Sequence, residues 1–127
     1  MTKDDIKLKL KDLTVLFVDD EEFVVETMQD VLPMLFKDSY FAYNGLDGLT
    51  KAQDNKIDVL ITDLSMPKMN GIDMIKKIKI FRPDTKIICV SGHNESEFTK
   101  KARELNCSFI IKPISSGELF KVFGEVL

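Results

Sequence analysis

Acidic residues directly follow two short apolar runs in this chain. Asp19 and Asp20 follow residues 14–18, and Asp63 follows residues 57–62. Runs this short and rich in Val, Ile and Leu are typical of strands buried on both faces of a parallel sheet. Because ligands of open α/β sheets bind beyond the carboxyl ends of the strands, we expect the three carboxylates to meet in one crevice. Neighbouring carboxylates repel, and a hard cation with oxygen ligands, Mg2+ above all, would hold them together.

The same repulsion predicts an altered titration of the acidic cluster. Without a cation, at least one of the three carboxyl groups should have a raised pKa, because like charges disfavour joint ionisation. Replacing Asp20 with Asn should then stabilise the metal-free protein and abolish Mg2+ binding. The alternative interpretation is that the three acids are surface residues that flank strands or cap helices.

The composition is that of one ordinary globular domain. The chain has 127 residues, of which 44% are hydrophobic and 31% charged. Its net charge of −3 gives no electrostatic reason for direct binding of nucleic acid. We expect no membrane contact, because no apolar stretch approaches the ~20 residues that span a bilayer and no signal peptide is present. Cys89 and Cys107 lack partners at metal-ligand spacing, which favours inert core thiols and a cytoplasmic location.

Strand-like and helix-like segments alternate along the chain. Strands are expected at residues 14–18, 39–42, 57–63, 86–91 and 108–111. The helices between and after them are expected to pack through Val24, Met28, Val31, Leu32 and Leu35; Leu46, Leu49 and Ala52; Ile72, Ile75 and Ile78; Phe98, Ala102 and Leu105; and Leu119, Val122, Phe123 and Val126. This alternation predicts right-handed crossovers and an α/β fold, a (βα)5 three-layer sandwich with helices on both faces of a parallel sheet.

Local signals mark the ends of the helices. The expected starts are Asn44–Gly45 and Asn70–Gly71, with capping-box spacing at Asn94 and Glu97 and at Ser115 and Glu118. Pro33 should kink or tighten the last turn of the first of these helices. Gly48 costs the second helix up to about 1 kcal/mol of propensity relative to Ala. The fourth helix has few apolar residues, which predicts low local stability.

Residues 1–12 form an N-terminal extension to an expected domain of residues 13–127. Ile6, Leu8 and Leu10 alternate with lysines as in a strand, whereas Ile6, Leu10 and Leu13 fit one face of a helix. We expect this extension to be helical.

The last two strands also end in residues that could do chemistry. Ser91 closes the fourth strand and Lys112 follows the fifth. Four segments of the chain match the motifs of a known family: residues 17–21, 63–71, 90–92 and 111–113, that is, FVDDE, DLSMPKMNG, VSG and IKP. Through them the chain resembles the receiver domain of bacterial two-component response regulators over about residues 12–127. The resemblance implies a flavodoxin-like fold with strand order 2-1-3-4-5.

The resemblance also implies a role for each acidic residue. Asp63 would be the phosphoacceptor, taking a phosphoryl group from a histidine kinase or a phosphotransfer protein. Asp20, Asp63 and the backbone carbonyl of Ser65 would bind Mg2+ directly, and Asp19 would bind it through a water molecule. A cation is needed because a carboxylate otherwise repels an anionic phosphoryl group.

Three further residues acquire roles from the resemblance. Lys112 would pair with one phosphoryl oxygen, and Ser91 would hydrogen-bond another. Phe109 lies where the family carries an aromatic switch residue, often Tyr, so Ser91 and Phe109 would couple phosphorylation to a change of conformation. The alternative interpretations are a Lys side chain that extends along the surface and a Ser that caps a helix.

The resemblance implies a signalling switch whose partner-binding face comprises the fourth helix, the fifth strand and the fifth helix. No enzyme activity is expected beyond self-phosphorylation and self-dephosphorylation. An aspartyl phosphatase would need Asp-x-Asp, whereas Asp19 and Asp20 are adjacent, and a flavin protein would need a phosphate loop after the first strand. A degenerate receiver that serves only as an interaction surface is the remaining alternative, which Mg2+ titration would test. The sequence leaves the identity of the output partner open. It also leaves open whether phosphorylation causes dimerisation, and whether the chain is a stand-alone regulator or the receiver of a longer protein.

Overall fold

A computed structural model of the chain describes residues 1–92 and 97–127. The strands are β1 (Thr14–Val18), β2 (Asp38–Ala42), β3 (Val59–Asp63), β4 (Lys86–Ser91) and β5 (Ser108–Ile111). The helices are α1 (Lys3–Leu10), α2 (Glu22–Leu35), α3 (Gly45–Asp54), α4 (Gly71–Phe81), α5 (Glu97–Glu104) and α6 (Ser116–Val126). None of the helices in the described ranges is long and apolar enough to span a membrane.

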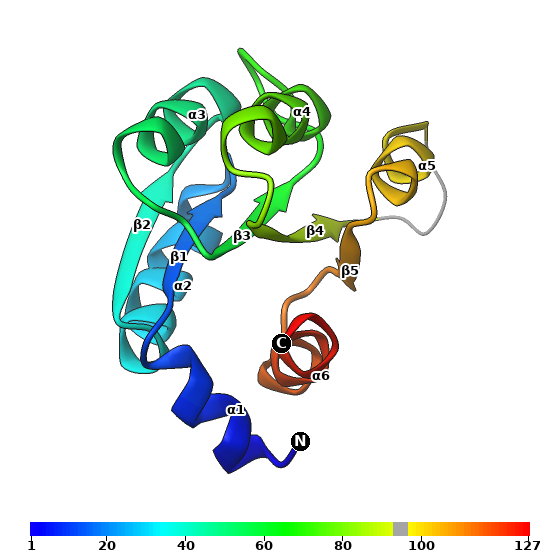
Figure 1. Ribbon diagram of the computed structural model, residues 1–127. Helices are drawn as coiled ribbons and strands as arrows, with labels where there is room; N and C mark the ends of the chain where they lie inside the picture. The colour runs from blue at the N-terminus through cyan, green and yellow to red at the C-terminus, as the bar shows by residue number, and fades with distance from the viewer. Residues whose placement is uncertain (93–96) are drawn as a thin grey trace.

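All five strands pair in parallel, in the order β2-β1-β3-β4-β5, as predicted (Figure 1). Helices α1, α2 and α6 lie on one face of the sheet, and α3, α4 and α5 lie on the other. The register sets Val18 beside Thr62, so β1 and β3 end at the same level. The residues that follow these two strands therefore begin at the same edge of the sheet.

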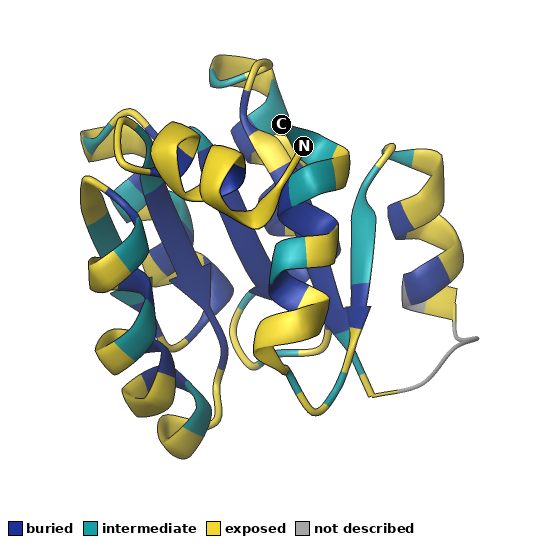
Figure 2. Cartoon of the chain, turned by 90° about the horizontal axis from the view of Figure 1, so that it is seen from below, coloured by how far each residue is buried: buried dark blue, intermediate teal, exposed yellow. Residues whose placement is uncertain are grey.

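The central strands are largely apolar because helices cover both of their faces (Figure 2). In β1, Val15 and Phe17 pack with α2 and α6, whereas Leu16 and Val18 pack with α3 and α4. All four side chains are fully buried. Complete burial on two faces explains why the sequence shows a continuous apolar run here and no alternation.

The helix α3, which is the second of the five helices predicted between and after the strands, differs from its prediction at one residue. Leu46 was expected to point inward, yet it is about half exposed. The predictions for Ala52, which is fully buried, and for Leu49, which packs partly buried against the core, are confirmed, and the other buried positions of α3 are Gly45 and Gly48. Gly48 lies so close to α4 and β1 that a Cβ atom there would be 2.7 Å from Met74 Sδ. This close approach rotates the helix so that its small residues, and not Leu46, face the sheet.

Smaller differences concern the ends of elements. β3 begins at Val59, two residues later than expected, and β2 begins at Asp38, one residue earlier. The helix α2 continues through Pro33 to Leu35. The predicted caps hold where they are described: Asn44, Asn70 and Ser115 each accept a hydrogen bond from the backbone N–H three residues later. The capping box expected at Asn94 lies outside the described residues.

The N-terminal segment forms the helix α1, which packs against α6. Ile6 and Leu10 are buried in the core that α2 and α6 share, whereas Leu8 is exposed. The ammonium of Lys3 lies 4.8 Å from the centroid of the Phe120 ring of α6, a cation–π distance. The extension thus belongs to the same core as the receiver-like part of the chain.

Candidate functional site

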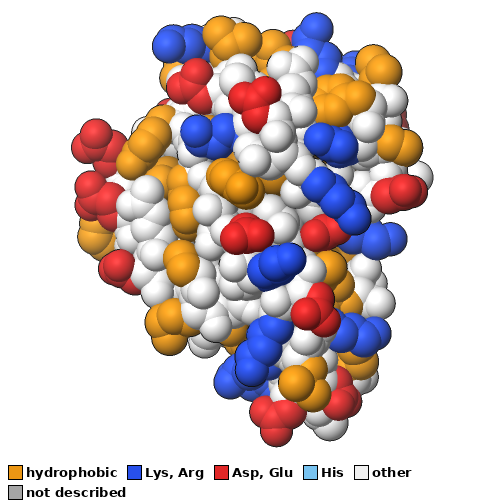
Figure 3. Space-filling model, turned by 60° about the vertical axis from the view of Figure 1, so that its left-hand side comes forward, with side chains coloured by type: hydrophobic (Ala, Val, Ile, Leu, Met, Phe, Trp, Pro, Cys, Tyr) orange, Lys and Arg blue, Asp and Glu red, His pale blue; other side chains and the backbone are white. Residues whose placement is uncertain are grey.

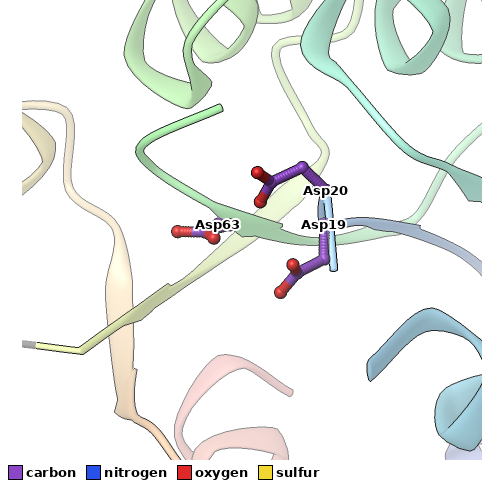
Figure 4. Close-up of side chains that lie close together, drawn as sticks. All are labelled: Asp19, Asp20 and Asp63. Carbon is purple, nitrogen blue, oxygen red and sulfur yellow. The ribbon is translucent and has the colours of Figure 1, made fainter. Parts of the chain in front are cut away.

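The three acidic side chains at the carboxyl ends of β1 and β3 meet at one edge of the sheet (Figure 4). One carboxylate oxygen from each of Asp19, Asp20 and Asp63 lies within 4.8 Å of the others. Asp19 is fully buried, Asp63 is partly buried and Asp20 is exposed. The structure therefore brings together the three carboxylates that the sequence placed in one crevice.

The buried carboxylate of Asp19 has one satisfied oxygen and one unsatisfied oxygen. Its Oδ1 accepts a hydrogen bond of 2.9 Å from the backbone N–H of Glu21. Its Oδ2 accepts none from the residues that the structure describes, although it lies 3.3 Å from the Lys112 Nζ. Burial raises the pKa of Asp19, and the charge of Asp63 adds to this, while the Glu21 N–H and Lys112 oppose it.

A raised pKa in the cluster was predicted, and Asp19 confirms its direction. The expected cause was repulsion between carboxylates, whereas burial is the larger contribution at Asp19. Burial disfavours the ionised form because the carboxylate loses its hydration.

The carboxylate of Asp63 is held by the start of the β3–α4 loop. Its Oδ1 accepts a hydrogen bond of 2.7 Å from the Leu64 N–H, and the Ser65 N–H lies 3.4 Å away. The loop then folds back so that the Gly71 N–H donates to the Leu64 carbonyl at 2.8 Å. Ser65 therefore lies next to Asp63, while the use of its carbonyl as a metal ligand stays a prediction.

Lys112 lies among carboxylates at the end of β5. Its Nζ donates to Glu21 Oε1 at 2.8 Å and to Asp63 Oδ2 at 3.2 Å, and it lies 3.3 Å from Asp19 Oδ2. Burial lowers the pKa of Lys112, but Glu21, Asp63 and Asp19 together raise it by more, so the net shift is upward. The ammonium is therefore charged at neutral pH. Sequence reasoning gave Glu21 no role, although its place directly after the acidic pair was visible.

Ser91 and Phe109 lie on the two neighbouring strands that lead to this edge. Ser91 is opposite Ile111 in the register, and its carbonyl accepts a hydrogen bond of 2.9 Å from the Lys112 N–H. Phe109 is half-buried beside the core that faces α3, α4 and α5. The guanidinium of Arg103, in α5, lies 5.5 Å from the centroid of its ring. Phe109 thus links α5 to β5, while its switching role stays a prediction.

The acidic cluster has the chemistry of a site for a hard divalent cation. Its donors are carboxylate oxygens, the ligands that Mg2+ and Ca2+ prefer. Asp19 Oδ2, which is buried without a hydrogen bond from the described residues, is an atom that a cation or its water could satisfy. The residues present therefore fit a metal ion.

Comparison with known protein families decides the class of this protein. The family model described as "Response regulator receiver domain" matches residues 15–123. The chain belongs to this family. It is thus a receiver domain of two-component signalling, in which the acidic cluster and Lys112 lie together at one edge of the sheet.

Relatives of this receiver domain include chemotaxis proteins and transcriptional regulators. The chemotaxis protein CheY of Thermotoga maritima is 31% identical over 114 residues, which cover 88% of this chain and 95% of that protein. The transcriptional regulatory protein HptR of Staphylococcus aureus is 26% identical over 117 residues, which cover 89% of this chain and 46% of HptR. The chain therefore spans less than half the length of that regulator.

Solved structures of receiver domains have the same fold. CheY4 of Vibrio cholerae has a TM-score of 0.82 and 25% identity, covering 91% of this chain and 99% of that chain. The receiver domain of Ssk1 from Saccharomyces cerevisiae, solved with the histidine phosphotransfer protein Ypd1, has a TM-score of 0.79 and 22% identity. That match covers 91% of this chain and 89% of the other. At this identity the likeness to Ssk1 concerns the fold alone.

Proposed function

We propose that this receiver domain is a phosphorylation-activated switch that takes a phosphoryl group on Asp63 from a histidine kinase or a phosphotransfer protein. The observation that carries the proposal is the convergence of Asp63, two further carboxylates and Lys112 at one edge of a receiver fold. Asp63 and Asp19 both contact Lys112 and a backbone N–H, but Asp19 is fully buried, whereas Asp63 is only partly buried and can be reached by a donor. Asp63 is therefore the carboxylate best placed to act as the nucleophile.

The proposed transfer is a single displacement at phosphorus. An Asp63 carboxylate oxygen attacks the phosphorus of a phosphohistidine, a P–O bond forms, and the P–N bond breaks with its electron pair going to the imidazole nitrogen. Lys112 moves its hydrogen bond from the carboxylate to a phosphoryl oxygen and offsets the developing charge. Ser91 hydrogen-bonds a second phosphoryl oxygen in this proposal. Self-phosphorylation from the donor, and hydrolysis of the aspartyl phosphate by water to free Asp63 and inorganic phosphate, are the only chemistry expected.

Mg2+ is the cation proposed for the acidic cluster. Asp20, Asp63 and the Ser65 carbonyl would hold it directly, with Asp19 acting through a water molecule. When bound, the ion would supply positive charge that reduces repulsion between the nucleophile and the incoming phosphoryl group. Lys112 contributes a permanent positive charge of its own beside Asp63.

The surroundings of the site support a protein donor. A pocket of about 470 Å3 beside Lys112 is lined mainly by apolar side chains, including Phe23, Val24 and Ile114. Phe23 is 79% exposed, so a partner that covered it would bury apolar surface. The complex of the Ssk1 receiver with Ypd1 supports a phosphotransfer protein as one such partner.

The proposal extends to location and output. The free thiols of Cys89 and Cys107 support a reducing, cytoplasmic compartment. The net charge of −3, and the mixed acidic and basic side chains on the face in Figure 3, support protein partners over direct nucleic-acid binding. The output partner would bind α5, β5 and α6, with a phosphorylation-dependent dimer as an alternative occupant of that face.

Intact-mass measurement after incubation with acetyl phosphate tests the proposal. Wild type should gain one phosphoryl group when Mg2+ is present and none when it is chelated. Asp63→Asn should remove the label, whereas Asp84→Asn, at an exposed carboxylate in the α4–β4 loop, should keep it. Continued single labelling of Asp63→Asn would show that another residue is the acceptor.

A further inference from the structure

Glu21 has a contact that its position in the helix does not explain. It is the N-cap residue of α2, yet its side chain makes no capping hydrogen bond. Ser, Thr, Asp and Asn are the residues that normally serve at this position. The Glu21 carboxylate instead reaches Lys112, 91 residues away in the sequence, and accepts a hydrogen bond of 2.8 Å from Nζ. The Glu21 side chain therefore binds Lys112 and does not cap the helix.

Among the residues that the structure describes, this contact is the shortest of the three that Lys112 makes with carboxylates. The distances from Nζ are 3.2 Å to Asp63 and 3.3 Å to Asp19. Glu21 is outside the group of acids that can share a metal ion among the described residues. Its carboxylate thus competes for the lysine without belonging to the metal cluster.

Phosphorylation changes what Lys112 has to neutralise. A phosphoryl group adds about −1.5 to −2 charges and three strong acceptor oxygens next to the lysine. Glu21 then becomes both a rival acceptor for the ammonium and a negative charge beside the phosphoryl group. Its side chain is 58% exposed, so it can move into solvent without a change in the core.

We propose that Glu21 is a positioning residue that holds Lys112 in the unphosphorylated protein and releases it when Asp63 takes a phosphoryl group. The inference rests on the proposed function, because release is defined by the arrival of that group. Its consequence is that Glu21 slows phosphorylation, since the incoming phosphoryl oxygens must displace it from the ammonium.

Three variants separate the contact from the charge. Glu21→Gln removes the charge, and Glu21→Asp keeps the charge but shortens the side chain by one methylene, so that it no longer reaches Lys112. Glu22→Gln is the matched control, because Glu22 is the next residue and is exposed in the first turn of α2. At saturating Mg2+, both Glu21 variants should be phosphorylated by acetyl phosphate about two- to fivefold faster than wild type, the scale of a partly exposed ion pair. Glu22→Gln should keep the wild-type rate.

A second measurement follows Lys112 without any phosphoryl donor. In the metal-free protein, the NMR resonances of the Lys112 ε-methylene group should shift in Glu21→Gln and Glu21→Asp and stay in place in Glu22→Gln. A rate increase in Glu21→Gln but not in Glu21→Asp would reduce the effect to charge alone and overturn the inference. Wild-type rates in all three variants would overturn it too, while the proposed function would stand. Failure of wild type to take any phosphoryl group would instead overturn the proposed function, and the release step with it.

Discussion

Gly71 packs against the backbone of Asp63 so closely that any Cβ atom at position 71 would collide with the Asp63 carbonyl oxygen. A Cβ atom at position 71 would also lie 2.9 Å from the Leu64 Cα. Because Leu64 donates the hydrogen bond that orients the Asp63 carboxylate, Gly71 helps to position that carboxylate through the backbone. The turn at Asn70–Gly71, which the sequence marks as the start of a helix, is thus also part of the site.

Gly71→Ala should therefore damage both stability and phosphorylation. The collision is with backbone atoms, which cannot rotate away, and overpacking of this kind costs about 1–3 kcal/mol. A displaced Asp63 should also slow labelling by acetyl phosphate about tenfold or more. Chemical denaturation and intact-mass kinetics measure the two effects. Gly117→Ala in α6 is the control, because the nearest atom there is 4.0 Å away, and it should stabilise by about 0.4–1 kcal/mol.

Gly48→Ala tests whether packing or helix propensity decides at α3. Propensity alone favours Ala by about 0.8–1 kcal/mol. In the structure, a Cβ there would be 2.7 Å from Met74 Sδ and 2.9 Å from Val18 Cγ2, both on fully buried residues. We expect a net loss of about 1 kcal/mol, since overpacking costs about 1–3 kcal/mol. An increase in the free energy of unfolding would show that α3 and α4 can separate without cost.

Asp19→Asn should stabilise the metal-free protein at neutral pH. The pKa of Asp19 is raised in the folded state, so ionisation of this buried group opposes folding above that pKa. The stability advantage of the variant should be complete at neutral pH and should shrink as pH falls towards 3.8, the ordinary value, where wild type is also protonated. Denaturation curves between pH 3.5 and pH 8, without metal, measure this difference. A difference that grew on acidification would contradict the sign of the shift.

Much of the site follows from local sequence signals. Short apolar runs that end in Asp19, Asp20 or Asp63 indicate buried parallel strands, and the geometry of such sheets brings their ends together. Lys112 was predictable for the same reason, because it directly follows the last strand. In each case, the type of one residue and its position relative to its strand are enough to predict that it lies at the site.

The remaining features depend on contacts between distant segments. The exposure of Leu46 results from the approach of α3 to α4 at Gly48, which helical spacing alone does not encode. Glu21 resembles any solvated acid until β5 places Lys112 beside it. Burial is the main cause of the raised pKa of Asp19, and it likewise depends on how the loops enclose that carboxylate.

Ser91 and Phe109 should transmit phosphorylation without being needed for it. The Ser91 hydroxyl can move towards a phosphoryl oxygen, and Phe109, on the neighbouring strand, is only half-buried and can rotate inward. Its ring contacts the Arg103 guanidinium of α5, so rotation would alter a contact with that helix. Such a response is a shift between existing conformations, limited by the difference in their contacts with the phosphoryl group.

Ser91→Ala and Phe109→Ala should thus accept one phosphoryl group in the presence of Mg2+ yet lose much of the structural response. Amide NMR with the phosphoryl mimic beryllofluoride measures it: in wild type, shifts should spread from Asp63 into residues 97–112. Phe81→Ala, at a partly exposed ring at the end of α4, controls for the loss of an aromatic side chain and should keep the spread. If both switch variants show the wild-type spread, coupling through Ser91 and Phe109 is wrong, even with Asp63 as the acceptor. The signal would then reach α5 by another route, such as the Lys112 N–H bonded to the Ser91 carbonyl, which neither substitution removes.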